Sequence, residues 1–115
     1  MARVLIVEDD DLLRDILGQM VHELGHTAAT VPDFESALAF LARTSPSAIL
    51  ANVVLPDGTG VELCKAAENL GINCGLLSGN PTIVSSFKAA QIPFLAKPFS
   101  VEQLDRFLVS LLTRG

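Results

Sequence analysis

Four apolar segments of the chain each lead into polar residues that could do chemistry together. These residues are Glu8 with Asp9, then Asn52, Ser78 and Lys97. Neighbouring carboxylates repel each other and lose hydration when they are brought together, and a hard divalent cation with oxygen ligands offsets that cost. Mg²⁺ is favoured where water molecules can complete its octahedron. Glu8 and Asp9 therefore suggest a magnesium site, provided that the fold brings the other groups near them.

Each of these residues also has a simpler interpretation when it is taken alone. The acidic run at residues 8–11 suits the first turn of a helix, where a capping acceptor and negative charge stabilise the free amides. Lys97 would suit an ordinary surface, and Ser78 an ordinary loop. The site is favoured because all these groups follow predicted strands, whose carboxyl ends meet at one edge of a parallel sheet.

Two patterns of apolar residues, which take turns along the chain, predict the strands and helices that must hold these residues. Short β-branched runs predict five strands, at residues 4–7, 27–31, 48–54, 72–78 and 92–96. Apolar residues at helical spacing predict helices within residues 13–24, 34–41, 63–70 and 104–112, with a weaker one near Ile83, Val84 and Phe87. The helix boundaries are marked by Gly25 and Gly71, by Asn80 before Pro81, and by a capping box of Ser100 and Gln103.

The strands are apolar almost throughout, which indicates burial on both faces. Helical segments between strands imply right-handed crossovers, so we expect an α/β fold of the (βα)5 doubly wound type, with helices on both faces of a parallel sheet. At 115 residues, the chain is expected to form one domain over residues 1–115.

Composition excludes several classes of protein. Half of the residues are hydrophobic, 18% are charged and the net charge is -5, which argues against a disordered chain and against direct binding to nucleic acid. No apolar stretch approaches the roughly 18 residues that a membrane span needs, and residues 8–11 interrupt any signal-peptide core. We therefore expect a soluble cytoplasmic protein.

The chain has two cysteines, Cys64 and Cys74, and both lie in apolar segments. Their spacing is not that of metal ligands. We expect buried, reduced thiols in preference to a disulfide or a redox pair.

Four motifs in register give the chain its resemblance to a known family. They are residues 4–10, 52–60, 76–79 and 94–99. Together they resemble the receiver domain of two-component response regulators over essentially the whole chain. The resemblance implies a flavodoxin-like, five-stranded parallel sheet in the order 2-1-3-4-5.

The same resemblance implies roles for individual residues. Glu8 and Asp9 would hold Mg²⁺, together with the side chain at position 52 and the backbone carbonyl of Val54. The Ser78 hydroxyl would contact a phosphoryl group, and Lys97 would stabilise it. Ser78 and Phe94 would be the switch residues that respond to phosphorylation.

Asn52 departs from the family pattern. In the family, an aspartate four residues before the proline of this loop accepts the phosphoryl group, and counting back from Pro56 leads to Asn52. An amide is a far poorer nucleophile than a carboxylate, so we expect no phosphotransfer at this position. With one acid fewer, Mg²⁺ binding should be weak or absent, and Lys97 could be held by Asp9. Asp57 is an unlikely substitute acceptor, because its turn should point it away from the acidic pair.

These observations favour a signalling module that acts by protein contact and is not an enzyme. The resemblance implies a histidine kinase, a phosphotransfer protein or another receiver as partner, bound through the fourth helix, fifth strand and fifth helix, with no nucleic acid and no membrane. We expect a monomer or a weak homodimer. Two alternatives stay open: an ordinary Mg²⁺-dependent phospho-accepting receiver in which aspartate was changed to Asn52 by engineering, and a small flavodoxin-like cofactor binder.

Overall fold

A five-stranded parallel sheet forms the centre of the computed structural model, which describes residues 2–80 and 92–114. Its strands lie in the order β2-β1-β3-β6-β7, and every neighbouring pair is parallel. Their bounds are β1 Arg3–Val7, β2 Thr27–Val31, β3 Ala48–Asn52, β6 Asn73–Ser78 and β7 Phe94–Ala96. Because β6 and β7 are the fourth and fifth strands of this sheet, the predicted fold and strand order are confirmed.

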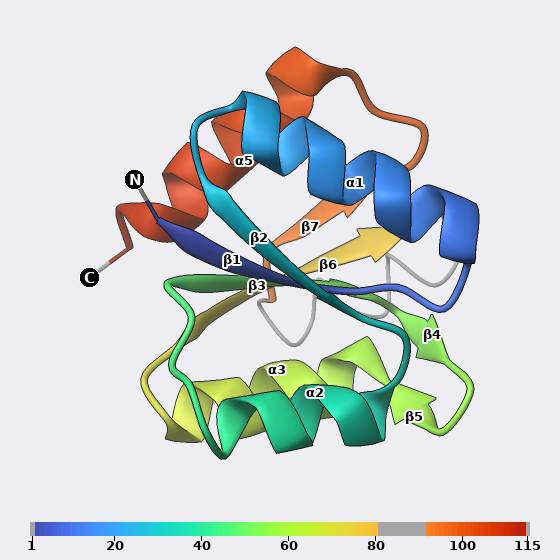
Figure 1. Ribbon diagram of the computed structural model, residues 1–115, viewed down its shortest axis with the longest axis vertical. Coiled ribbons are helices and arrows are strands. Elements are labelled where there is room, and N and C mark those ends of the chain that lie inside the picture. Colours follow the sequence, from blue (N-terminus) through green and yellow to red (C-terminus); the bar gives the residue numbers. More distant parts are fainter. Residues whose placement is uncertain (1, 81–91, 115) are drawn as a thin grey trace.

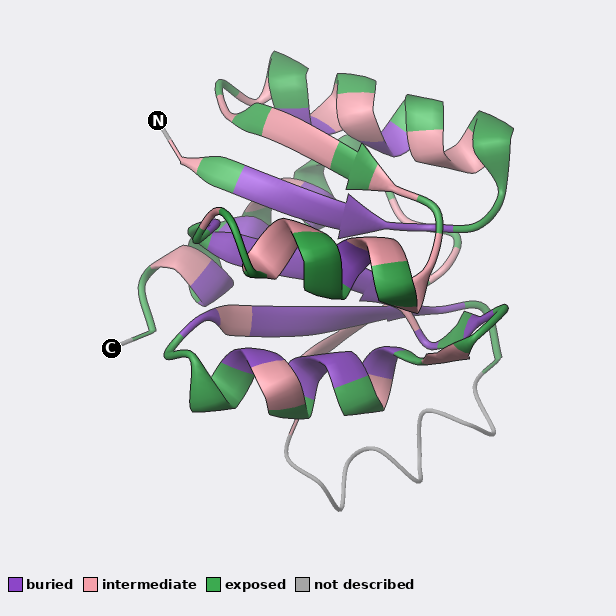
Figure 2. Cartoon of the chain, turned by 60° about the horizontal axis from the view of Figure 1, so that its bottom comes forward, coloured by how far each residue is buried: buried purple, intermediate pink, exposed green. Residues whose placement is uncertain are grey.

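Two pairs of helices cover the two faces of the sheet (Figure 1). Helices α1 (Asp11–Glu23) and α5 (Val101–Leu112) pack on one face, and α2 (Phe34–Leu41) and α3 (Gly60–Asn69) on the other. Successive strand residues point to opposite faces, so Leu5 joins the α2 and α3 side of the core while Ile6 joins the α1 and α5 side. Figure 2 shows the result, with buried residues along the strands and exposed ones on the outer helix faces.

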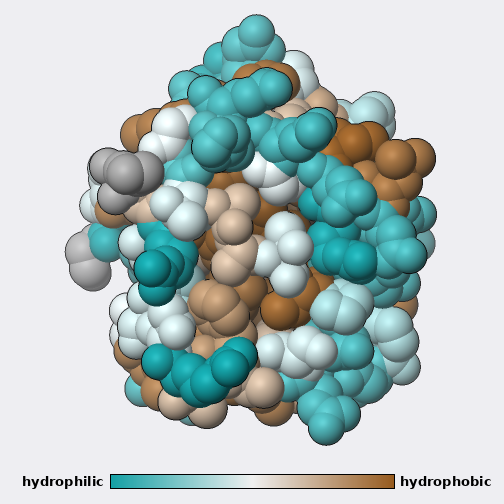
Figure 3. Space-filling model, viewed as in Figure 1, coloured by the Kyte–Doolittle hydropathy of each residue, from teal (hydrophilic) through white to brown (hydrophobic). Residues whose placement is uncertain are grey.

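The edge strand β2 is the least buried strand of the N-terminal half. Thr27 and Thr30 are exposed, and the residues between and after them are only half-buried. In the view of Figure 3, residues of hydrophobic to intermediate hydropathy lie at the centre, and hydrophilic residues lie around most of them. No helix within residues 2–80 and 92–114 is long and apolar enough to cross a membrane.

Side-chain caps begin each described helix. The carboxylate of Asp10 accepts a hydrogen bond from the amide of Leu13 at 2.9 Å, and Asp33 and Thr59 act in the same way for α2 and α3. The predicted capping box of Ser100 and Gln103 is present at the start of α5. Gly25 and Gly71 follow α1 and α3 with φ of 92° and 72°, a left-handed conformation that favours glycine and confirms both predicted helix ends. The predicted helix start at Pro81 and the helix near Ile83, Val84 and Phe87 lie outside the described residues.

The third predicted strand is shorter than expected. It ends at Asn52, and residues 54–55 (β4) instead pair in antiparallel fashion with residues 58–59 (β5) to form a small hairpin. Asp57 lies in its turn, and its carboxylate accepts hydrogen bonds from the amides of Phe34 at 2.8 Å and Glu35 at 2.9 Å. The expectation that Asp57 points away from the acidic pair is therefore confirmed.

The expectation of two reduced cysteines is wrong in this structure. Cys64 of α3 and Cys74 of β6 form a disulfide, with their Cα atoms 5.2 Å apart. The reason is the turn at Gly71, which reverses the chain so that α3 packs back against β6 and the two side chains meet in the core. Burial of both residues was expected, but their facing each other was not.

Helix α5 approaches the sheet closely at Gly75. A Cβ atom at this position would lie 2.6 Å from the ring of Phe107 and 3.0 Å from the side chain of Leu111. We therefore expect Gly75→Ala to lower the free energy of unfolding by about 1–3 kcal/mol, measured by urea denaturation. Gly79→Ala is the matched control, because a methyl group there meets no atom within 4 Å. Equal losses in the two variants would contradict this account of the packing.

The cap of α2 should make stability depend on pH in acid. Hydrogen bonds from the Ser36 side chain and then from its backbone amide hold the pKa of Asp33 below its ordinary value of 3.8. A carboxylate with a lowered pKa stabilises the fold above its ordinary pKa, and that contribution is lost as the pH falls through the folded value. The variant Asp33→Asn keeps a capping acceptor but has no titrating group at this position. As the pH falls, its urea unfolding midpoint should therefore decrease less steeply than that of the unchanged protein. The same acid dependence in both proteins would refute the assignment.

Candidate functional site

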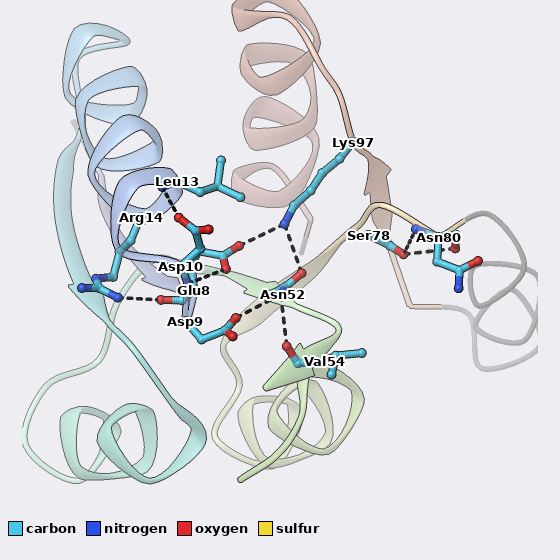
Figure 4. A network of polar contacts seen from close by, with 10 residues as sticks. All are labelled: Glu8, Asp9, Asp10, Leu13, Arg14, Asn52, Val54, Ser78, Asn80 and Lys97. Atoms are coloured by element: carbon cyan, nitrogen blue, oxygen red, sulfur yellow. Dashed lines mark hydrogen bonds and ion pairs between the residues drawn. The ribbon is translucent and has the colours of Figure 1, made fainter. Parts of the chain in front are cut away.

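The predicted site residues lie at the carboxyl ends of the parallel strands. Glu8 and Asp9 directly follow β1, Asn52 ends β3, and Lys97 directly follows β7. Figure 4 shows the side chains of these four residues pointing toward one another at this edge of the sheet. Of the five residues that were expected to converge, these four lie together, whereas Ser78, the last residue of β6, lies apart from Asn52 and Lys97.

Glu8 is the buried charge of the cluster, with a relative exposure of 2%. The Lys97 ammonium lies 3.0 Å from Glu8 Oε1, and the amide of Asp10 donates to Glu8 Oε2 at 3.0 Å. The guanidinium of Arg14 donates to the backbone carbonyl of Glu8 at 3.0 Å. A buried carboxylate is costly unless it is paired and hydrogen-bonded, and both of its oxygens are satisfied here.

The Asn52 amide uses both of its ends. Its Oδ1 accepts a hydrogen bond from Lys97 Nζ at 3.2 Å. Its Nδ2 donates to the Val54 carbonyl at 3.1 Å and to Asp9 Oδ1 at 3.4 Å. Since an ionised aspartate only accepts hydrogen bonds, it would place a negative oxygen against the Val54 carbonyl and the Asp9 carboxylate. The network as it stands therefore depends on an amide at position 52.

Lys97 does not bind Asp9, contrary to the expectation. The ammonium of Lys97 instead donates hydrogen bonds to Glu8 and Asn52. The physical reason is that Glu8 is buried and needs a counter-charge, whereas Asp9 is exposed and accepts from the donor end of the Asn52 amide.

Gly60 is a residue of the site that sequence reasoning did not single out. Its amide donates to the Val53 carbonyl at 2.8 Å. A Cβ atom on Gly60 would lie 2.5 Å from the Asn52 carbonyl oxygen and 2.7 Å from the Leu76 side chain. The start of α3 is thus pressed against the end of β3, which holds Asn52 in place. The sequence feature that could have indicated this close approach is the glycine at the end of the motif 52–60.

The two predicted switch residues lie outside this network. Ser78 is 4% exposed, and its hydroxyl accepts from the Asn80 amide and donates to the Asn80 carbonyl, both at 3.2 Å. In Figure 4 it lies apart from Asn52 and Lys97. Phe94 is partly buried against the core beneath α2 and α3. Their roles as switch residues stay predictions.

The donor set fits Mg²⁺ poorly. Both oxygens of Glu8 are already bound, and the Asn52 Nδ2 group faces Asp9 and the Val54 carbonyl, two of the predicted ligands. Within the described ranges, no group of three or more His, Cys, Asp or Glu side chains could hold a metal ion.

Comparison with known proteins settles the family. A family model described as the response regulator receiver domain matches residues 4–108. The chain belongs to this family. The resemblance seen in the four sequence motifs is thereby confirmed, and receiver domains of this kind are signalling modules that are generally not enzymes.

Curated relatives of this receiver domain include two mycobacterial proteins. The probable transcriptional regulatory protein TcrX of Mycobacterium tuberculosis is 28% identical over 116 residues, covering 96% of this chain and 50% of that protein. The response regulator MprA of Mycobacterium ulcerans is 28% identical over 118 residues, covering 98% of this chain and 51% of that protein. The chain thus spans about half the length of these relatives.

Solved structures agree with the fold. The receiver domain matches the Vibrio cholerae chemotaxis protein CheY4 with a TM-score of 0.85 at 28% identity, covering 97% of this chain and 99% of that one. It matches the receiver domain of Francisella response regulator 1452 with a TM-score of 0.85 at 22% identity, covering 99% and 98% of the two chains, a likeness of fold alone.

The pairing of Glu8 with Lys97 can be tested by stability. Lys97→Met leaves the Glu8 carboxylate buried without its counter-charge. Because Lys97 keeps 20% of its side chain exposed, we expect a loss of about 2 kcal/mol, below the usual range for a fully buried pair. Urea unfolding measures the loss.

The matched control is Lys65→Met, which removes an exposed lysine of α3 and should change stability by less than about 0.5 kcal/mol. Adding Glu8→Gln to Lys97→Met should recover part of the loss, because a neutral amide needs no counter-charge. Strictly additive losses would contradict a direct coupling.

Proposed function

We propose that this receiver domain signals through protein contacts and does not accept a phosphoryl group at position 52. The observation that carries the proposal is the Asn52 amide, with both of its ends engaged in the place where the family has its phosphate-accepting aspartate. The amide offers no carboxylate oxygen that could attack phosphorus. Its carbonyl oxygen also already faces Lys97, the cation that would otherwise stabilise an incoming phosphoryl group.

The same contacts support weak magnesium binding or none. The Asn52 amide group draws together Asp9 and the Val54 carbonyl, which are oxygens that a cation would otherwise bridge. A bound Mg²⁺ would have to displace these contacts and compete with Lys97 for Glu8. With two carboxylates in the cluster in place of three, the electrostatic attraction for the ion is also smaller.

In this proposal the network holds the domain in one arrangement, and partners recognise the surface that it presents. A histidine kinase, a phosphotransfer protein or another receiver is the proposed partner. The proposed face includes β7 and α5, and α5 exposes Val101 and Val109 at 38% and 51%, which suits contact with protein. The remaining part of that face, residues 83–87, lies outside the described residues. The net charge of -5 argues against direct contact with nucleic acid.

The decisive experiment compares the protein with Asn52→Asp in acetyl phosphate and Mg²⁺, using intact mass spectrometry. We expect no added phosphoryl group on the unchanged protein and one on Asn52→Asp. A phosphoryl group on the unchanged protein would overturn the proposal. In the Asn52→Asp background, Asp57→Asn is the control, because Asp57 caps α2 and should not be the acceptor.

The same pair of proteins tests the cation. Asn52→Asp should bind Mg²⁺ on the order of tenfold more tightly than the unchanged protein, because a third negative charge joins the cluster. Without Mg²⁺ it should be less stable, because carboxylate oxygens then face one another. Thermal melting with and without MgCl2 measures both effects. If Mg²⁺ raised the melting temperatures of the two proteins equally, the proposal that the Asn52 amide weakens Mg²⁺ binding would be contradicted.

A further inference from the structure

The disulfide lies on the face of the sheet that packs against α2 and α3. Cys64 and Cys74 keep only 6% and 8% of their surface exposed and belong to the core cluster on that face, together with Leu63, Ala67 and Ile72. They are separated by 10 residues, across the turn at Gly71. Neither residue takes part in the polar network around Asn52.

The surroundings of the two sulfurs suit the reduced state as well as the disulfide. A thiol behaves as a small hydrophobic group and needs no polar partner, so two thiols in this apolar cluster would leave no buried polar group unsatisfied. The backbone contacts across the turn do not depend on the disulfide, since the Ile72 amide donates to the Ala67 carbonyl at 2.9 Å. The register of β6 on β3 also holds Cys74 beside Ile49. The fold can therefore persist when the bond is broken.

We propose that Cys64 and Cys74 form a reversible redox pair whose state sets the stability of the receiver domain. A small disulfide such as oxidised glutathione takes two electrons and two protons from the two thiols. The products are the Cys64–Cys74 disulfide and two molecules of reduced glutathione. An excess of reduced glutathione drives the reverse exchange. Both residues retain a little exposed surface, and in this proposal the small thiol reaches them when the turn between α3 and β6 opens. This pair acts independently of what happens at position 52.

The first test equilibrates the full chain in buffers of varied glutathione ratio, followed by acid quenching, alkylation in denaturant and intact mass spectrometry. We expect two species, one with no alkyl group and one with two, whose proportions follow the glutathione ratio and return when the ratio is reversed. Two alkylated thiols in excess oxidised glutathione would overturn the proposal. So would a disulfide that excess reduced glutathione opens only in denaturant.

The second test concerns stability. Closing a loop of this length restricts the unfolded chain, so the oxidised protein should melt roughly 10 °C above the reduced one. The double variant Cys64→Ala/Cys74→Ala should be indifferent to reductant, which separates the effect of the bond from any other effect of the reagent. Equal melting temperatures of the oxidised and reduced protein, or an equal fall in the double variant, would refute the proposed role.

Discussion

The pairing of a buried carboxylate with an ammonium from the other end of the chain is the constraint on which this domain depends. Glu8 directly follows β1 and has almost no exposure to water, so its charge must be balanced inside the protein. The balancing group, on Lys97, comes from 89 residues further along the chain. This contact ties the end of β1 to the loop between β7 and α5, and it fixes where the second acceptor of the ammonium, Asn52, must lie.

The amide at position 52 completes that arrangement without a further charge. The oxygen of the amide accepts a hydrogen bond from the ammonium, and its nitrogen donates hydrogen bonds to a carboxylate and a backbone carbonyl. No buried side-chain nitrogen or oxygen in the described part of the chain lacks a hydrogen-bond partner. A receiver fold can thus keep its acidic edge fully hydrogen-bonded with an amide at position 52.

Much of the fold could be predicted from sequence because its signals are local. Continuous apolar strands, the capping box at Ser100 and the glycines after α1 and α3 each act over a few residues. The β4–β5 hairpin was not predicted, because strands of two residues are too short to show a periodic apolar pattern. The convergence of Glu8, Asp9, Asn52 and Lys97 follows from the parallel sheet, but which acid receives the ammonium depends on burial, and burial is a property of the assembled fold. The disulfide was missed for the same reason: apolar context indicates that a cysteine is buried and not which residue it faces.

The turn of the small hairpin has one more consequence. Asp57 covers the first two amides of α2, a helix that follows a different strand and lies 22 to 23 residues earlier in the chain. The segment that carries the Val54 carbonyl is therefore attached at its tip to α2 as well as at its base to β3. A rearrangement of residues 54–59 that moves Asp57 would withdraw its carboxylate from these two amides. The hairpin beside Asn52 is therefore coupled to a helix that has no residue in the polar network.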